Sequence, residues 1–153
     1  PPARPLAAIT RIRRVILLDT NVLSEIMRSS PEPTVLRWFA AHPATRLYTS
    51  TITEAEILYG LALLPDGKRR ATMEAAARAM FAEDFAGRVL PFDSAAAQNF
   101  AAIAATRRRA GRPISHADAQ IAAIARACGA SLATRNITDF EGCEVMLINP
   151  WVA

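Results

Sequence analysis

The sequence predicts an α/β protein, in which helices cover both faces of a central parallel sheet of four to five strands. Short apolar runs alternate along the chain with longer segments of helical composition, which is the order that a parallel sheet requires. The run at 15–18 has four apolar residues in succession, as expected for a strand buried on both faces. The length of 153 residues allows one domain with a substantial core and is too short to expect two.

Local signals place the elements in chain order. Capping residues or prolines precede the helical segments, and glycines or turn sequences follow several of them. The expected strands are 15–18, 47–49, 88–92, 131–134 and 145–148. The expected helices are 20–28, 34–41, 53–64, 68–85, 93–110 and 115–128, with a turn or short helix at 137–140.

Two helices carry expectations about burial. In the helix at 34–41, Val35, Leu36 and Phe39 are expected to face the core. The helix at 53–64 is apolar nearly all round, and a helix of that kind is expected to be buried.

The net charge of +4 is located in the first 14 residues. Pro1–Arg14 holds four of the 18 basic residues and none of the 14 acidic ones, so residues 15–153 are balanced. We expect a basic, flexible N-terminal arm at 1–14 and a single domain at 15–153. Charge alone is therefore a weak argument for nucleic acid. The cluster at 107–109 is either a favourable partner of a helix dipole or a patch that faces RNA.

Cysteine usage and hydropathy bear on the compartment. Cys128 and Cys143 lack the spacing of a metal site, and no apolar run is long enough to cross a bilayer. The first residues hold no apolar segment of signal-peptide length. We expect reduced thiols in a cytoplasmic protein without a membrane partner.

Acidic and amide side chains occur where predicted strands end or where the next helix begins. Asp19 follows the first strand, Asp118 lies in the first turn of the helix at 115–128, and Asn136 and Asp139 follow the fourth strand. Because the carboxyl ends of parallel strands share one rim of a sheet, these groups are expected to converge. Asp118 also lies on an apolar helix face, where an unpaired carboxylate is costly.

Each of these acids also has a purely structural interpretation. Asp19 fits a helix cap, and Ser115 with Asp118 fits a capping box. Glu54 and Glu56 both fit capping boxes near the start of the helix at 53–64. That helix is apolar all round, so its periodicity does not decide which of the two faces the rim.

A shared pocket of carboxylates predicts a bound cation, since several of them cannot all stay ionised without one. Oxygen ligands without histidine or cysteine select a hard ion, Mg²⁺ or Mn²⁺. Such an ion polarises a phosphodiester and lowers the pKa of a bound water. Glu56 or Asp139 is expected to help orient that water.

With these residues in view, the chain resembles the PIN-domain ribonucleases of the VapC toxin family, and their FitB branch in particular. The resemblance extends from Val15 to Trp151 and is carried by motifs in the same order and spacing. They are Leu-Leu-Asp-Thr-Asn at 17–21, Ala-Glu-x-x-x-Gly at 55–60, Asp-x-x-Ile-Ala-Ala at 118–123, Ala-Thr-Arg-Asn at 133–136 followed by Asp139-Phe140, and Asn-Pro-Trp at 149–151.

The resemblance implies a set of site residues. Asp19, Glu56 and Asp118 correspond to the metal-binding acids of the family, which selects Glu56 because the family's acid stands four residues before a glycine. FitB-like members can carry aspartate where this chain has Asn136. Asn136 or Asp139 is therefore implied as the further polar group of the site.

The resemblance also implies an activity and partners. It points to a metal-dependent endoribonuclease that is the toxin of a type II toxin–antitoxin pair and forms a homodimer. A VapB-like or FitA-like antitoxin would block the site and carry the DNA-binding domain, so that DNA is contacted only indirectly. FitB-like proteins suggest an alternative, a PIN module that acts mainly within a DNA-bound regulatory complex with little or no nuclease activity.

Overall fold

The computed structural model describes residues 15–153, so the arm expected at 1–14 lies outside the described residues. Five short strands form one parallel sheet in the order β3-β2-β1-β4-β5, which confirms the predicted fold class. The strands are β1 (Ile16–Leu18), β2 (Leu47–Ser50), β3 (Val89–Leu90), β4 (Ser131–Ala133) and β5 (Leu147–Ile148).

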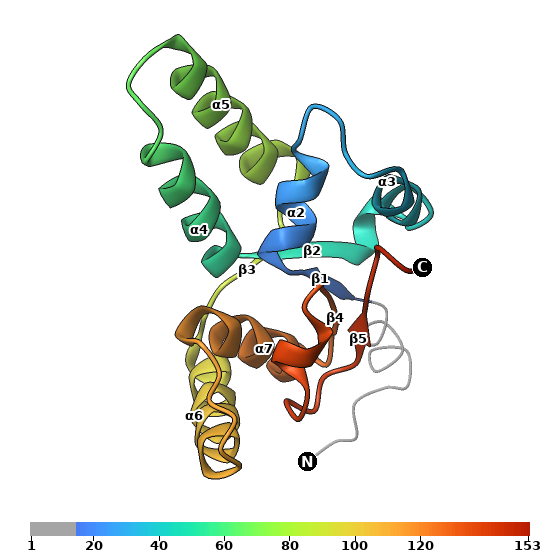
Figure 1. Cartoon of the computed structure of the whole chain (residues 1–153), viewed down its shortest axis with the longest axis vertical. Coiled ribbons are helices and arrows are strands. Elements are labelled where there is room, and N and C mark those ends of the chain that lie inside the picture. The colour runs from blue at the N-terminus through green and yellow to red at the C-terminus, as the bar shows by residue number, and fades with distance from the viewer. Residues whose placement is uncertain (1–14) are drawn as a thin grey trace.

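Helices follow the strands and lie on both sides of the sheet, with α2 to α5 on one side and α6 and α7 on the other (Figure 1). Two 3₁₀ helices, Ala44–Arg46 and Ile137–Phe140, and a π-helical turn at Met80–Asp84 complete the described chain. The α-helices are α2 (Thr20–Ile26), α3 (Pro33–Ala40), α4 (Thr51–Ala62), α5 (Lys68–Ala79), α6 (Ser94–Arg109) and α7 (His116–Cys128). No helix in the described range combines the length and apolar content needed to cross a membrane.

The central strand β1 divides two hydrophobic clusters. Ile16 and Leu18 pack with α2, α3, α4 and α5, whereas Leu17 packs with α6 and α7. All three side chains are at most 3% exposed, as expected for alternating side chains on a strand that is covered on both faces. This burial fixes β1 and therefore the position of the residue that follows it, Asp19.

Two predictions about helix burial are wrong in part. In α3, Leu36 is 47% exposed and the core position is taken by Trp38, while Val35 is buried as expected. Tyr59 in α4 and Leu63, the residue that follows α4, are each 67% exposed. Helices α4 and α5 form a hairpin that projects beyond the sheet (Figure 1), and the buried side chains of α4, Thr53, Ile57 and Leu61, lie along one strip of the helix.

The helix caps place the starts of α4 and α7. The hydroxyl of Ser50 accepts a hydrogen bond from the Thr53 N–H at 3.1 Å, so α4 begins at Thr51, two residues earlier than predicted. The hydroxyl of Ser115 accepts from the Asp118 N–H at 3.2 Å and caps α7. Each cap satisfies an amide that the first turn of a helix leaves without a partner.

Arg107 is buried, so the patch that was considered for 107–109 does not include it. Its Nε donates to the carbonyl oxygen of Arg112 at 2.7 Å, and its Nη1 donates to the carbonyl oxygens of Asp139 and Glu141 at 2.8 and 3.0 Å. This side chain joins the end of α6 to the loop before α7 and to the segment after β4.

Candidate active site

Four of the five predicted site residues surround one cleft at the carboxyl end of the sheet. The cleft has a volume of about 570 Å³, and Asp19, Glu56, Asp118 and Asn136 line it. These residues come from four separate segments: the end of β1, the second turn of α4, the first turn of α7 and the loop after β4. Asp139 does not line the cleft.

Asp19 is the most rigidly held of these groups. Its backbone N–H donates to the carbonyl oxygen of Ala133 at 2.9 Å, which ties the ends of β1 and β4 together. Its Oδ1 accepts from the Thr20 N–H at 2.8 Å, and its Oδ2 accepts from the Thr134 hydroxyl at 2.7 Å. Asp19 therefore caps α2 and faces the cleft at once, so its two predicted roles coexist.

Burial governs the ionisation of Asp19. The residue is 4% exposed, and loss of hydration raises its pKa to about 6 from an ordinary value of 3.8. The hydrogen bonds from Thr134 and Thr20 oppose this shift, while the charges of Asp118 and Glu56 add to it. The pocket thus favours either a proton or a cation beside this carboxylate.

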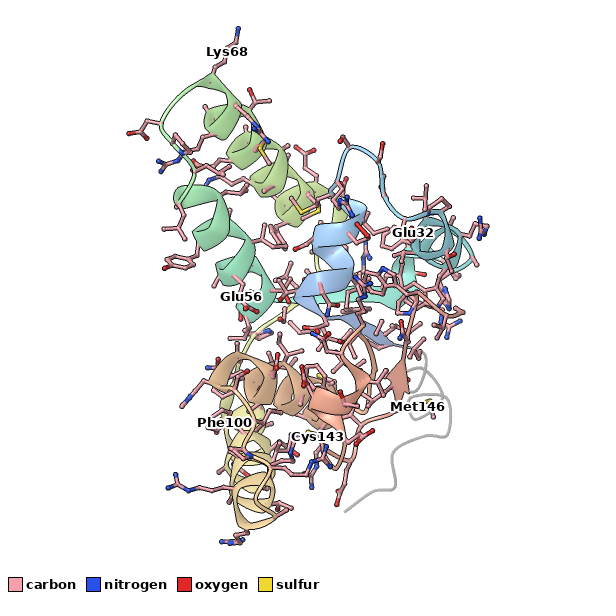
Figure 2. All side chains as sticks on the ribbon, viewed as in Figure 1. Glu32, Glu56, Lys68, Phe100, Cys143 and Met146 are labelled. Carbon is pink, nitrogen blue, oxygen red and sulfur yellow. The ribbon has the colours of Figure 1, made fainter. Side chains whose placement is uncertain are left out.

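Glu56 lies at the end of α4 nearest the sheet (Figure 2) and is exposed. Its Oε1 accepts from the Thr20 hydroxyl at 2.8 Å, and that hydroxyl is also 3.0 Å from the Thr53 hydroxyl. Glu54, the other acid considered for this position, does not line the cleft. The structure thus places the acid four residues before Gly60 at the site.

Asp118 is half-buried in the first turn of α7, and burial raises its pKa. The negative charges of Asp139 and Glu56 raise the pKa further, whereas the Ser115 hydroxyl and the Arg107 guanidinium lower it. Ser115 supplies the cap of this helix, which leaves the carboxylate of Asp118 directed to the cleft.

The segment after β4 contributes one residue to the cleft and one near it. Asn136 is exposed and lines the cleft, and its N–H donates to the Thr134 hydroxyl at 3.1 Å. Asp139 lies in the 3₁₀ helix and acts on Asp118 through its charge alone. As a direct site residue, Asn136 is therefore the better placed of the two.

The residues fit a hard divalent ion in donor chemistry, since the acids around the cleft offer only oxygen and repel one another. Within residues 15–153, however, no three histidine, cysteine or acidic side chains stand as a group that could hold an ion. Glu56 is the exposed member of the set and is hydrogen-bonded only to a hydroxyl, so it is the side chain with most freedom to turn. Asp19 and Asp118 are the more firmly placed ligand candidates.

Four further residues that were not predicted as site residues also line the cleft: Glu25, Arg28, Arg135 and Trp151. A signal for the first two was available in their spacing. Glu25 stands four residues after Asn21, and Arg28 stands three residues after Glu25, which places all three along one side of α2 and its end. Arg135 and Trp151 lie within the motifs at 133–136 and 149–151, but only the fold brings these two segments together at the cleft.

Known proteins are similar to this chain over most of its length. The family described as PIN domain matches residues 16–141. The chain is 42% identical to VapC ribonuclease Y4jK of Sinorhizobium fredii, over 90% of this chain and 98% of that protein. It is 38% identical to toxin FitB of Neisseria gonorrhoeae, over 90% of this chain and 99% of that protein. The structure of FitAB bound to an IR36 DNA fragment is similar with a TM-score of 0.84 and 38% identity, covering 90% of this chain and 96% of that chain.

Proposed function

Because this chain belongs to the PIN domain family, we propose that it is an endoribonuclease dependent on Mg²⁺ or Mn²⁺ and the toxin of a type II toxin–antitoxin pair. The observation that carries the proposal is the cleft shared by Asp19, Glu56 and Asp118. A buried acid with a pKa of about 6 beside two further acids is typical of a site built for a cation. The name of the ribonuclease relative supports RNA as the substrate.

Each side chain has a distinct task in this proposal. Asp19 and Asp118 would hold the ion. When bound, the ion would polarise the phosphodiester and lower the pKa of a bound water. The Thr20 N–H and the Thr134 hydroxyl keep the Asp19 carboxylate in one orientation before substrate arrives. Glu56 is exposed and is the carboxylate best able to accept a proton at Oε from an attacking water.

The proposal includes partners. FitAB, a similar structure, is a complex bound to DNA. By analogy, a FitA-like or VapB-like antitoxin would cover the cleft of this chain, two copies of the chain would associate, and DNA would be contacted through the antitoxin. The balance of 14 basic and 14 acidic residues in 15–153 supports indirect rather than direct contact with DNA. We place the protein in the cytoplasm, where its RNA substrate would be found.

A second candidate function is favoured by the same DNA-bound structure. In it, the chain serves mainly as part of a regulatory complex and its cleft is rarely used for catalysis. The two functions differ in one measurable property, since only the first requires that removing a cleft carboxylate abolish cleavage of RNA.

The test is cleavage of a structured RNA by the purified chain with Mg²⁺ or Mn²⁺ and with EDTA. Asp19→Asn and Asp118→Asn should each lower cleavage at least a hundredfold, since each removes an ion ligand. Glu56→Gln should also lower it. Glu54→Gln is the matched control, because it removes a carboxylate from the same helix outside the cleft.

Cleavage that is equal in wild type, Asp19→Asn and Asp118→Asn would come from a contaminant and would overturn the ribonuclease proposal for these residues. An absence of metal-dependent cleavage in the wild type, together with tight assembly on antitoxin and DNA, would favour the regulatory function instead. Equal losses in Glu54→Gln and Glu56→Gln would contradict the assignment of Glu56.

A further inference from the structure

The cleft is lined by basic and aromatic side chains as well as by the acids. Asp19, Glu56 and Asp118 line it together with two arginines. The lining residues that the acids do not account for include Asn21, Ser24, Glu25, Arg28, Arg135 and Trp151. They come from α2 and its end, from the loop after β4 and from the turn after β5.

Arg28 is held in place by a buried acid. Its Nη1 lies 2.9 and 3.2 Å from the two carboxylate oxygens of Glu25, which is 7% exposed. The Arg28 side chain is itself 66% exposed, and its Nε and Nη2 have no hydrogen-bond partner among residues 15–153. Glu25 therefore fixes one side of the guanidinium and leaves the other side available at the cleft.

Arg135 is held in place by an aromatic ring. Its guanidinium carbon lies 5.1 Å from the ring centroid of Trp151, and its backbone N–H donates to the Asn21 Oδ1 at 3.4 Å. Its side chain is exposed and forms no ion pair within the described range, although acids line the same cleft. Stacking on tryptophan orients a guanidinium and leaves its edge N–H groups unused.

From this arrangement we propose that Arg28 and Arg135 bind phosphates of the RNA backbone next to the bond that is cut. The inference rests on the proposed ribonuclease function and adds the residues that hold its substrate. Phosphate oxygens match the planar donor set of arginine, and phosphate contacts set the register of a nucleic acid on a protein. Arg28 and Arg135 are thus substrate-positioning residues, which touch neither the attacking water nor the ion.

The acids of the cleft give the physical reason for such a pair. Asp19, Glu56 and Asp118 repel an RNA strand, and a single divalent ion offsets this repulsion only at the scissile phosphate. Neighbouring phosphates need other cations, and the two arginines are the basic residues that line this cleft. A purely structural role would account for the Arg28–Glu25 ion pair, but not for Arg135, which lines the same cleft and forms no ion pair within residues 15–153.

The test is RNA binding without catalysis. A short fluorescent single-stranded RNA is titrated with the full chain in EDTA at several KCl concentrations, and anisotropy is measured. Arg28→Gln and Arg135→Gln should each lower affinity about tenfold at low salt. Each should also reduce the slope of log affinity against log salt by about 0.7, the value for one lost phosphate contact on a single strand.

Three further variants separate binding from folding. Arg78→Gln removes an exposed arginine on α5, outside the cleft, and should leave the affinity and the slope unchanged. Arg28→Gln combined with Glu25→Gln avoids an unpaired buried carboxylate and should still lose affinity about tenfold. Arg135→Lys keeps the charge and should retain the salt slope.

With metal present, Arg28→Gln and Arg135→Gln should each raise KM for RNA cleavage and leave kcat nearly unchanged. This is the result expected for groups that bind substrate and transition state equally. Affinity and slope that match wild type in both glutamine variants would overturn the inference, while intact cleavage by wild type would leave the proposed function standing. Loss of RNA binding in these variants with no cleavage by wild type would show that the two arginines contact RNA phosphates, but it would refute the proposed function and the placement of these contacts beside a scissile bond. Loss of antitoxin binding alone would assign the two arginines to the protein partner and overturn the RNA assignment.

Discussion

Replacing Asp19 with asparagine should stabilise the metal-free protein at neutral pH. The carboxyl is buried, and its pKa is raised from 3.8 to about 6 in the folded chain. The folded state therefore keeps a proton that the unfolded state releases, and stability falls as pH rises from about 4 to about 6. At 1.36 kcal/mol per unit of pKa, the full penalty above pH 6 is roughly 3 kcal/mol.

The asparagine side chain has nearly the same shape but does not ionise. Its oxygen still accepts from the Thr20 N–H, whereas its amide nitrogen no longer accepts from the Thr134 hydroxyl, a loss worth about 1 kcal/mol. The expected net gain for Asp19→Asn is therefore about 2 kcal/mol at pH 7.5. Near pH 4.5, wild type carries only about a third of the penalty, roughly 1 kcal/mol, which the lost hydrogen bond offsets, so the gain should vanish.

Urea unfolding in EDTA at these two pH values measures the difference. Asp84→Asn is the control, because this acid is exposed and lies outside the cleft. It should change stability by less than about 0.5 kcal/mol at both pH values. A variant at Asp19 that is less stable than wild type by the same amount at both pH values would show that the carboxylate acts as a helix cap alone, and the argument from burial would fail.

Four other outcomes are expected. Asp118→Asn should raise metal-free stability at pH 7.5 by a smaller amount than Asp19→Asn, since Asp118 is only half-buried; loss of stability in urea unfolding would favour a capping role. Mg²⁺ at a hundred times Kd should stabilise wild type by about 2.7 kcal/mol and so raise its melting temperature, whereas Asp19→Asn should show no such rise. Arg107→Met should destabilise by about 3 kcal/mol or more, because three carbonyl oxygens lose their donor. Leu17→Ala should destabilise by about 3–5 kcal/mol, and Leu63→Ala, at an exposed position, by less than about 1 kcal/mol in the same assay.

Strand-end residues were predictable because the parallel sheet imposes a simple rule. An acid directly after a buried strand must lie at the carboxyl rim, and Asp19 does so without reference to any other part of the chain. Asp118 was predictable for a different reason, since a carboxylate on an apolar helix face indicates a compensating partner. The predictions for Asp19 and Asp118 both rest on their immediate sequence neighbours and do not require knowledge of the tertiary arrangement.

Helix exposure was not predictable in the same way. Tyr59 in α4 and Leu63 just after it have the hydrophobic character of core residues, yet both are 67% exposed. Their exposure depends on where the α4–α5 hairpin leaves the sheet, which is a property of the tertiary arrangement (Figure 1). A sequence that is apolar on every face of a helix therefore does not say which face is covered.

The three arginines at the end of α6 differ in burial and in hydrogen bonding in the folded chain. Arg108 and Arg109 are exposed, whereas Arg107 is buried and donates to carbonyl oxygens before α7 and after β4. The first of these segments leads into α7, which carries Asp118, and the second follows Asn136, so one buried guanidinium helps to set the distance between two walls of the cleft. Its positive charge also lowers the pKa of Asp118, against the effect of burial. Arg107 therefore links the packing of α6 to the ionisation of the site without lining the cleft.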